Sequence, residues 1–503
     1  MLVLKPLRKV HKFCSNLFDR LPGCTKELLM RTCYQQQQNR HFGQPVHETH
    51  PHLMGMDEVT PGITRAEYQQ RRLRLATMVQ EAKTQQSIKH SIVLIPSATK
   101  VIMTNDIPYT FRQNTDFLYM SGFQEPDSML VILISDCDFQ AVLFVPKHDA
   151  DRELWDGPRS GDIKALHLTG VSESYNSDEL EKFLYNYCKN HKEYAVWYNT
   201  NKPIKSQHNA HSIVDEFLKQ NNKTKFVQNP LPLIEQMRLI KSTAEIKLMT
   251  QTTQMASKAF IEVMRASKPN VNESFLYAKM DYECRIRGAE FLAYPPVVAG
   301  GDRANVIHYT RNNCLINDGE LVLMDAGCEY HGYTSDITRT WPVSGKFTKA
   351  QRLLYECVLE VQEALLGLCT PQYSLADLYK HMFDLLTPRL LLMNVIPSEV
   401  SKDEHMLTKL LRELCPHDVG HYLGMDVHDT ASISKRIKLQ PGMVVTIEPG
   451  LYVKSSNTVV PAQFRGIGIR IEDNVLITDG GPVVLTRDCP KHPDHIETLM
   501  ASS

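Results

Sequence analysis

Residues 321–347 read LVLMDAGCEYHGYTSDITRTWPVSGKF, and they give the clearest indication of the fold of the last third of the chain. It contains two apolar runs, one around Asp325 and one around Asp336, eleven residues apart. Pairing of these runs across a turn near Gly332 predicts a β-hairpin with both carboxylates on one surface. Either aspartate alone could instead cap a turn. Adjacent buried carboxylates stay ionised together only beside a cation, so the pair indicates a metal site.

Three further side chains suited to metals follow. His421 lies in PHDVGHYLGMDVHD, Glu448 in VVTIEPGLY and Glu472 in GIGIRIED. Four carboxylates and one imidazole form a hard, oxygen-rich set whose negative charge suits two divalent ions better than one. Paired ions are suited to activating a bridging water for hydrolysis. The alternative for the two glutamates is a salt bridge to a buried arginine, for which Arg470 is the candidate.

These five frames, in this order, resemble the pita-bread metallopeptidases, which include methionine aminopeptidases, prolidases and aminopeptidase P. The sequence of residues 321–347, together with the motifs HYLGMDVHD and RGIGIRIED, is most similar to that of the Xaa-Pro aminopeptidases. Upstream, NDIPYTFRQNTDFLYMSGFQEPDS (105–128) and RELWDGPRSG (152–161) resemble the amino-terminal domain of the same group. The similarity to its mitochondrial members runs from roughly His50 to Glu497.

The resemblance implies an aminopeptidase that hydrolyses the N-terminal Xaa-Pro bond by a hydroxide bridging two divalent ions. Its substrates would be peptides with proline at the second position. The implied metal ligands are the five residues above, and the carboxylate-rich ligation favours Mn²⁺ over Zn²⁺. Glu448 would also carry protons between the water and the leaving nitrogen.

The resemblance also assigns residues that hold no metal. His308, in NVIHYT, and His428 would be catalytic and contact the substrate carbonyl and scissile region. Tyr294, in LAYPPVVAGG, matches a substrate-pocket position, and Tyr452 and Arg470 are expected to bind substrate or support the pocket. His417 is expected to support the metal ligands without binding a metal itself. Outside the resemblance, a histidine or a tyrosine in such a segment is more often a packed core or loop residue.

Two alternatives remain open at this point. A prolidase-type dipeptidase would share the fold and the metals. A catalytically inactive binding protein of the same fold would be expected to lose ligands, whereas all five positions here keep a competent side chain.

The expected organisation is a leader and linker at 1–50, an α/β amino-terminal domain at 51–237 and an α+β pita-bread domain at 238–503. In the first domain we expect a helix from Thr64 to about Ala82 and another at Ser177–Lys189. Strand-like runs are predicted at Ser91–Pro96, Phe117–Met120, Met129–Ser135, Ala141–Pro146 and Ala195–Tyr198.

The pita-bread domain contains a weak internal repeat. Capping boxes at Ser242–Glu245 and Thr348–Gln351 open helices to about Ala266 and Cys369. Second helices are expected at about Asn272–Arg287 and from Ser374. Each pair precedes strands that carry two carboxylates, and the later strands are expected to close the chain. This pattern predicts a pseudo-two-fold domain with the metals between its halves.

The composition is that of an ordinary globular enzyme, with 42% apolar residues and a net charge of −1. Nothing in it suggests a nucleic-acid partner. No apolar run approaches the ~20 residues needed to cross a bilayer, so membrane insertion is not expected. The 12 scattered cysteines are typical of free thiols in a reducing compartment. A homodimer is the expected assembly.

The first forty residues are basic, with eight Lys or Arg against Asp19 and Glu27. Apolar residues between Leu4 and Leu21 recur at helical spacing. This is the composition of a mitochondrial presequence, although a basic tail on a cytosolic enzyme is the alternative. We expect the mitochondrial matrix as the main location, with a cytosolic form that lacks the leader.

Overall fold

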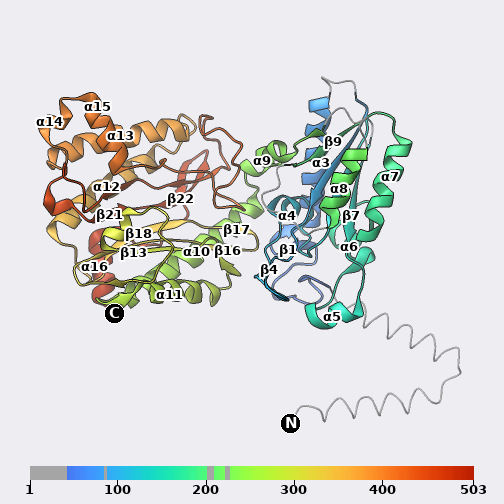
Figure 1. Cartoon of the computed structure of the whole chain (residues 1–503), viewed down its shortest axis with the longest axis horizontal. Helices are drawn as coiled ribbons and strands as arrows, with labels where there is room; N and C mark the ends of the chain where they lie inside the picture. Colours follow the sequence, from blue (N-terminus) through green and yellow to red (C-terminus); the bar gives the residue numbers. More distant parts are fainter. Residues whose placement is uncertain (1–41, 84–87, 137, 201–208, 221–226, 503) are drawn as a thin grey trace, which may run out of the picture. The chain divides into compact units, whose positions relative to one another are not determined.

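The structure, a computed structural model, describes residues 42–83, 88–136, 138–200, 209–220 and 227–502. The chain forms two compact units (Figure 1). The first comprises residues up to Gln70, Ile88–Val196 and Lys202–Phe226; the second comprises Arg71–Ser87, Trp197–Asn201 and Val227–Ser503. Most of the expected leader lies outside the described residues. Among those described, no helix is both long and apolar enough to cross a membrane.

The first unit is built on a sheet in which β9, β3, β6, β7 and β8 are successive neighbours. The apolar runs make β3 and β6 almost fully buried, as expected for central strands. The strands are β3 (His90–Pro96), β6 (Met129–Ile134), β7 (Phe139–Val145), β8 (Glu173–Asn176) and β9 (Tyr194–Tyr198). Four of the five predicted strands are thereby confirmed. The helices are α4 (Thr115–Ser121), α5 (Ala150–Asp156), α6 (Gly161–Thr169), α7 (Leu180–Asn190) and α8 (Asn209–Gln220). The expected helix from Thr64 is α3 (Arg65–Lys83).

The predicted strand at Phe117–Met120 is wrong, because these residues lie in helix α4. The Asn114 side chain accepts a hydrogen bond from Phe117 N and caps the helix start, and Gly122 ends the helix at φ 69°. Aromatic residues favour strands in general. Here the Asn114 and Gly122 caps, together with the burial of Phe117 and Met120, stabilise a helix instead.

The second unit repeats a helix pair followed by strands, as predicted. The first half contains α10 (Thr243–Ala266), α11 (Glu273–Arg285), β13 (Val297–Gly300), β15 (Leu321–Ala326) and β18 (Ile337–Pro342). The second half contains α12 (Lys349–Gly367), α13 (Leu375–Leu392), β19 (Val444–Ile447), β20 (Gly450–Val453), β21 (Ile467–Arg470), β22 (Asp473–Thr478) and β23 (Gly481–Val484). The capping boxes at Ser242 and Thr348 are confirmed, and the helix expected from Ser374 also begins with a capping box. In Figure 1 the strands lie between the α10–α11 pair and the α12–α13 pair.

The later strands do not close the chain, contrary to the prediction. Helix α16 (Pro493–Ala501) follows them, with the His492 side chain as its cap and Pro493 in its first turn. Two further helices, α14 (Ser398–Ser401) and α15 (Glu404–Leu414), separate α13 from the His421 segment. Leucines, valines and isoleucines from both halves form one continuous core around the strands. The polar ligands are therefore held by a rigid, apolar frame.

Candidate active site

Asp325 and Asp336 face each other because of the register of β15 and β18. The strands are antiparallel, and Asp325 is paired with Thr338. Asp336 lies two residues before Thr338, and alternate residues of an extended chain point to the same face. The Tyr294 hydroxyl contacts both carboxylates and donates to Asp325 Oδ1 at 2.6 Å. The expected hairpin is confirmed, although a small hairpin of β16 (Cys328–Tyr330) and β17 (Tyr333–Thr334) forms its tip.

Glu448 and Glu472 occupy corresponding places in the second half. Strands β19 and β22 are antiparallel, and their pairing ends at Ile447 and Asp473. The two glutamates adjoin this last pair, so they lie opposite each other at the strand ends. Glu472 N donates to the Thr338 carbonyl at 3.0 Å, which joins the second half to β18. The four carboxylates thus meet where the two halves join.

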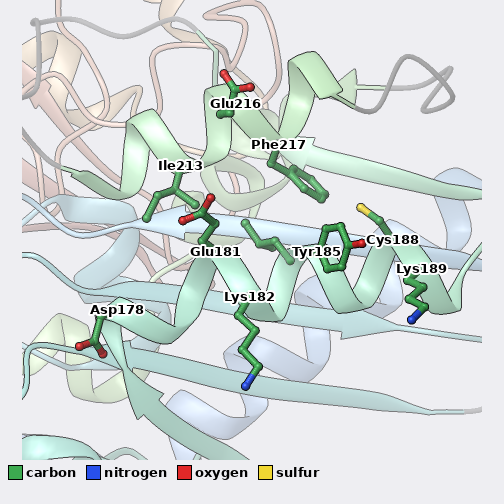
Figure 2. A pocket seen from close by; sticks show the side chains of 10 residues that line it. Asp178, Glu181, Lys182, Tyr185, Cys188, Lys189, Ile213, Glu216 and Phe217 are labelled. Carbon is green, nitrogen blue, oxygen red and sulfur yellow. The ribbon is translucent and has the colours of Figure 1, made fainter.

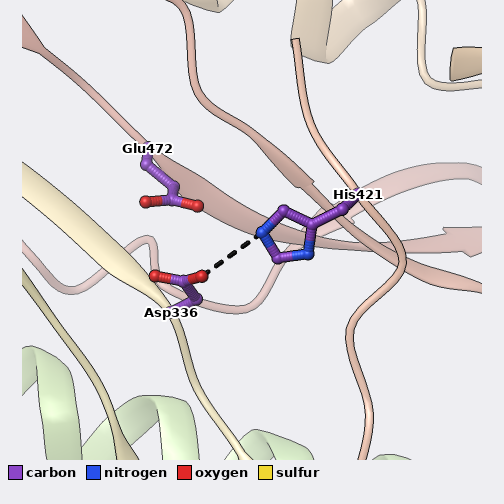
Figure 3. Close-up of side chains that lie close together, drawn as sticks. All are labelled: Asp336, His421 and Glu472. Atoms are coloured by element: carbon purple, nitrogen blue, oxygen red, sulfur yellow. Dashed lines mark ion pairs between the residues drawn. The ribbon is translucent and has the colours of Figure 1, made fainter. Parts of the chain in front are cut away.

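His421 completes the group from an irregular segment. Its backbone N–H donates to Thr446 Oγ1 at 3.1 Å, which fixes the segment beside β19. His421 Nε2 lies 3.4 Å from Asp336 Oδ2 and 3.7 Å from Glu448 Oε1. Figure 3 shows Asp336, His421 and Glu472 pointing toward one another; one ligand atom from each lies within 4.8 Å of the others.

The charges of this cluster are unbalanced without a cation. Burial raises the pKa of Glu472 well above its usual value, and the Asp336 carboxylate raises it further. Burial and the Asp336 carboxylate likewise raise the pKa of Asp325. Glu472 Oε1 is buried and has no hydrogen-bond partner in the part of the chain that the structure describes. An orphaned carboxylate oxygen beside other carboxylates and an imidazole fits divalent ions, which supply the missing positive charge.

Arg470 contributes the positive charge nearest to the cluster. Its side chain is 2% exposed, and it donates to Asp325 Oδ2 at 2.6 Å and to the Tyr452 hydroxyl at 2.7 Å. The arginine therefore pairs with Asp325, and no salt bridge to Glu448 or Glu472 is formed within 4.0 Å. On its other side, the Tyr452 hydroxyl lies 2.8 Å from His417 Nε2. The Tyr452 hydroxyl thus links Arg470 to His417.

The expected catalytic histidines lie at the rim of a cavity of about 460 Å³ that opens onto the carboxylates. His428 is exposed, and its ring packs edge-on against that of His421, with centroids 4.6 Å apart. Burial and then the nearby His421 lower the pKa of His428, which favours its neutral form. The predicted residues that line this cavity are His308, Asp325, Asp336, His417, His421, His428, Glu448, Arg470 and Glu472. The other two, Tyr294 and Tyr452, contact residues of this group.

Two supporting residues were not expected from the sequence. Thr338 Oγ1 donates to Glu472 Oε2 at 2.7 Å and accepts from Arg470 Nε at 3.0 Å. Asn474 Oδ1 accepts from the Asp336 backbone N–H at 3.1 Å. Thr338 follows Asp336 by two residues and Asn474 follows Glu472 by two, so strand alternation was the available signal.

A second hollow, of about 610 Å³, lies between α7 and α8 of the first unit. Figure 2 shows Tyr185, Ile213 and Phe217 among its side chains, with Glu181 and Lys182 nearby. Among its described residues, no three metal-ligating side chains bring their ligand atoms within 4.8 Å of one another. It therefore lacks the chemistry of the cavity in the second unit.

Known proteins resemble the chain over most of its length. Residues 247–479 match metallopeptidase family M24, and residues 68–197 match the aminopeptidase P N-terminal domain. Xaa-Pro aminopeptidase 3 of Rattus norvegicus is 48% identical over 92% of this chain and 91% of the relative. Intermediate cleaving peptidase 55, mitochondrial, of Arabidopsis thaliana is 39% identical over 94% and 90%. The structure of zinc-substituted Escherichia coli aminopeptidase P in complex with product has a TM-score of 0.80 at 34% identity, covering 88% of this chain and 99% of that one.

Proposed function

The chain belongs to the Xaa-Pro aminopeptidases of metallopeptidase family M24, and from this premise we propose that Asp325, Asp336, His421, Glu448 and Glu472 hold two divalent cations. The observation that carries the proposal is the unpartnered, buried Glu472 Oε1 beside Asp336 and His421. Carboxylate-rich ligation makes Mn²⁺ the preferred ion.

The family acts on peptides with proline at the second position. When bound, the ions lower the pKa of a water and polarise the scissile carbonyl. Glu448, which lines the cavity, takes up the proton of the attacking water and delivers it to the proline nitrogen. His428, held neutral, donates a hydrogen bond to the oxygen that becomes negative, and His308 orients the same region of the substrate.

Arg470, Tyr452 and Tyr294 have structural partners in this site, and their substrate-binding role is part of the proposal. Arg470, through its 2.6 Å contact, offsets part of the rise in the pKa of Asp325 that burial and the Asp336 carboxylate cause. The Tyr294 hydroxyl holds Asp325 beside Asp336. Together they preorganise the ligand set before the ions enter.

The test of the ligand assignment is the metal content of variants. We expect Asp336→Ala and Glu472→Ala to abolish activity and to bind at most one ion per chain, since both carboxylates belong to the group whose ligand atoms lie within 4.8 Å of one another and would hold the ions. His421→Ala should weaken mainly one site. Two tightly held ions in Asp336→Ala, measured by elemental analysis, would contradict the assignment.

Prolidase activity is the less favoured alternative. The rat relative is named Xaa-Pro aminopeptidase 3, and residues 68–197 match the aminopeptidase P N-terminal domain. We propose 51–237 and 238–503 as the bounds of the two domains, after a leader and linker at 1–50.

We further propose a homodimer. Strands β4 (Ile102–Thr104) and β5 (Ile107–Pro108) form a hairpin whose residues are all exposed. Met103 and Ile107 are each 53% exposed, and an exposed apolar patch of this kind is typical of an interaction surface. Light scattering on the purified enzyme, compared with Met103→Glu, tests the assembly: the variant should be monomeric.

Two observations support a proposed location. The first forty residues are basic, and the name of the Arabidopsis relative includes the word mitochondrial. We place the enzyme in the mitochondrial matrix, with a cytosolic form that lacks the leader.

A further inference from the structure

The turn that carries His428, Asp426–Thr430, is strained. Thr430 has φ 51°, in the left-handed region that β-branched residues rarely adopt. Its hydroxyl is buried and has no hydrogen-bond partner within the described ranges. Such features each cost about 1–3 kcal/mol and persist only where the surrounding structure over-determines them. Something must therefore hold the turn in this conformation.

The turn is held by three buried charges, which we call the charge clamp: Asp429, Arg238 and Lys241. The Asp429 side chain is 1% exposed and accepts hydrogen bonds from both cations, from Lys241 Nζ at 3.2 Å and from Arg238 Nη2. Arg238 Nη2 also donates to Asp426 Oδ2 at 2.6 Å. Arg238 lies in the last turn of α9 (Leu231–Leu239), and Lys241 lies in the short connection to α10.

Gly424 shows how closely the clamp is packed. A Cβ at this position would lie 2.4 Å from Asp429 Oδ2 and 3.1 Å from Lys241 Cε, so only glycine leaves room for the ion pair. The Gly424 carbonyl accepts hydrogen bonds from Thr334 N and Thr334 Oγ1, both at 2.9 Å. Thr334 lies two residues before Asp336. Gly424, two residues before the turn, thus packs against the clamp and is hydrogen-bonded to the chain segment that carries Asp336.

We propose that Asp429, Arg238 and Lys241 are positioning residues that aim His428 at the substrate. This rests on the catalytic role proposed for His428. Buried ion pairs add little net stability, because desolvation offsets their attraction, but their directed contacts fix geometry. A displacement of about 1 Å in a catalytic group lowers the rate by ~10²-fold. Removing one partner leaves a buried charge unpaired and lowers stability, but in the protein that remains folded the clamp affects turnover rather than metal binding.

Lys241→Met in the full-length enzyme tests the proposal. We expect kcat to fall about ten- to hundredfold, with KM and metal content unchanged. Asp429→Asn, which keeps the shape of the side chain, should show the same pattern, and Lys241→Arg should restore most of the turnover. The matched control is Lys279→Met on α11, where Glu283 is likewise held between two cations, Lys279 and Arg287. This variant should keep the wild-type kcat.

A double-mutant cycle decides whether the clamp acts through His428. In the His428→Ala background, Lys241→Met should cause no further loss of kcat. A full additional loss there, or wild-type kcat in both Lys241→Met and Asp429→Asn, would overturn the clamp while leaving the proposed function intact. Full turnover in His428→Ala would overturn the catalytic role of His428, and the clamp with it.

Discussion

Arg470 Nη2 lies 2.6 Å from Asp325 Oδ2, so a buried guanidinium from one half of the second unit neutralises a metal-ligating candidate of the other half. The arginine is 2% exposed, and its Nε and Nη1 donate to Thr338 and Tyr452. The Arg470–Asp325 contact joins the two halves of the second unit beside the carboxylate cluster, where Asp325 and Asp336 repel each other. It therefore stabilises the metal-free site and keeps Asp325 ready to bind a cation.

Arg470→Met should destabilise the metal-free protein strongly, because breaking a buried pair costs about 3–5 kcal/mol. Added Mn²⁺ should recover part of the lost stability by replacing the missing positive charge. Thermal unfolding followed by circular dichroism, with chelator and with Mn²⁺, measures both effects. Equal unfolding temperatures of variant and wild type in chelator would contradict the role given to Arg470.

His428→Ala should keep both metals and the fold but lower turnover by ~10²–10³-fold, the usual loss for one oxyanion donor. His428 packs against His421 from the cavity rim and is no member of the Asp336–His421–Glu472 group. Metal content and turnover should be measured on the same preparation. If metal is lost together with activity, His428 is a ligand and the placement of the histidines is wrong.

Much of the site was predictable because the four carboxylates lie in or directly beside apolar strands, which carry a signal of their own, whereas His421 lies in an irregular segment. Asp325 and Asp336 share one hairpin, so their convergence follows from strand alternation alone. The helix at Phe117 was missed because its Asn114 cap outweighs the strand preference of aromatic residues. The clamp could not be predicted: Lys241 and Asp429 are 188 residues apart, and no local pattern links them. Arg470 shows the same limit, since its true partner is Asp325 rather than the neighbouring Glu472.

Glu125→Gln should stabilise the protein at high pH. Glu125 is 4% exposed, its Oε2 has no partner in the described structure, and burial raises its pKa. The pKa of the Glu125 carboxyl is higher in the folded protein than in the unfolded chain, where it is 4.5. The protonated carboxyl therefore stabilises the fold below pH 4.5, and this contribution is lost as the pH rises through the pKa of the folded state. At pH 8 the variant should unfold at a higher temperature than the wild type. A gain of ~1 kcal/mol in the free energy of unfolding raises the unfolding temperature by about 2–4 °C. The difference should shrink toward pH 4.5; a difference independent of pH would contradict this reasoning.

The basic leader should direct import into mitochondria and be removed before His50. Its eight basic residues against two acids are drawn inward by the membrane potential, and the resemblance to the family begins only near His50. A carboxyl-terminally tagged chain can be fractionated and sequenced from its amino terminus. Cytosolic protein that keeps Met1–Arg40 as the main cellular form would contradict the predicted import.

The most direct test of the account is digestion of matched peptides by metal-depleted and Mn²⁺-reconstituted enzyme, followed by mass spectrometry. Three substrates suffice: a longer peptide with proline second, the same peptide with alanine second, and an Xaa-Pro dipeptide. We predict loss of a single residue from the proline peptide alone, with activity absent after chelation and regained with Mn²⁺. Comparable cleavage of the alanine peptide, preference for the dipeptide, or full activity after exhaustive chelation would contradict a metal-dependent Xaa-Pro aminopeptidase activity.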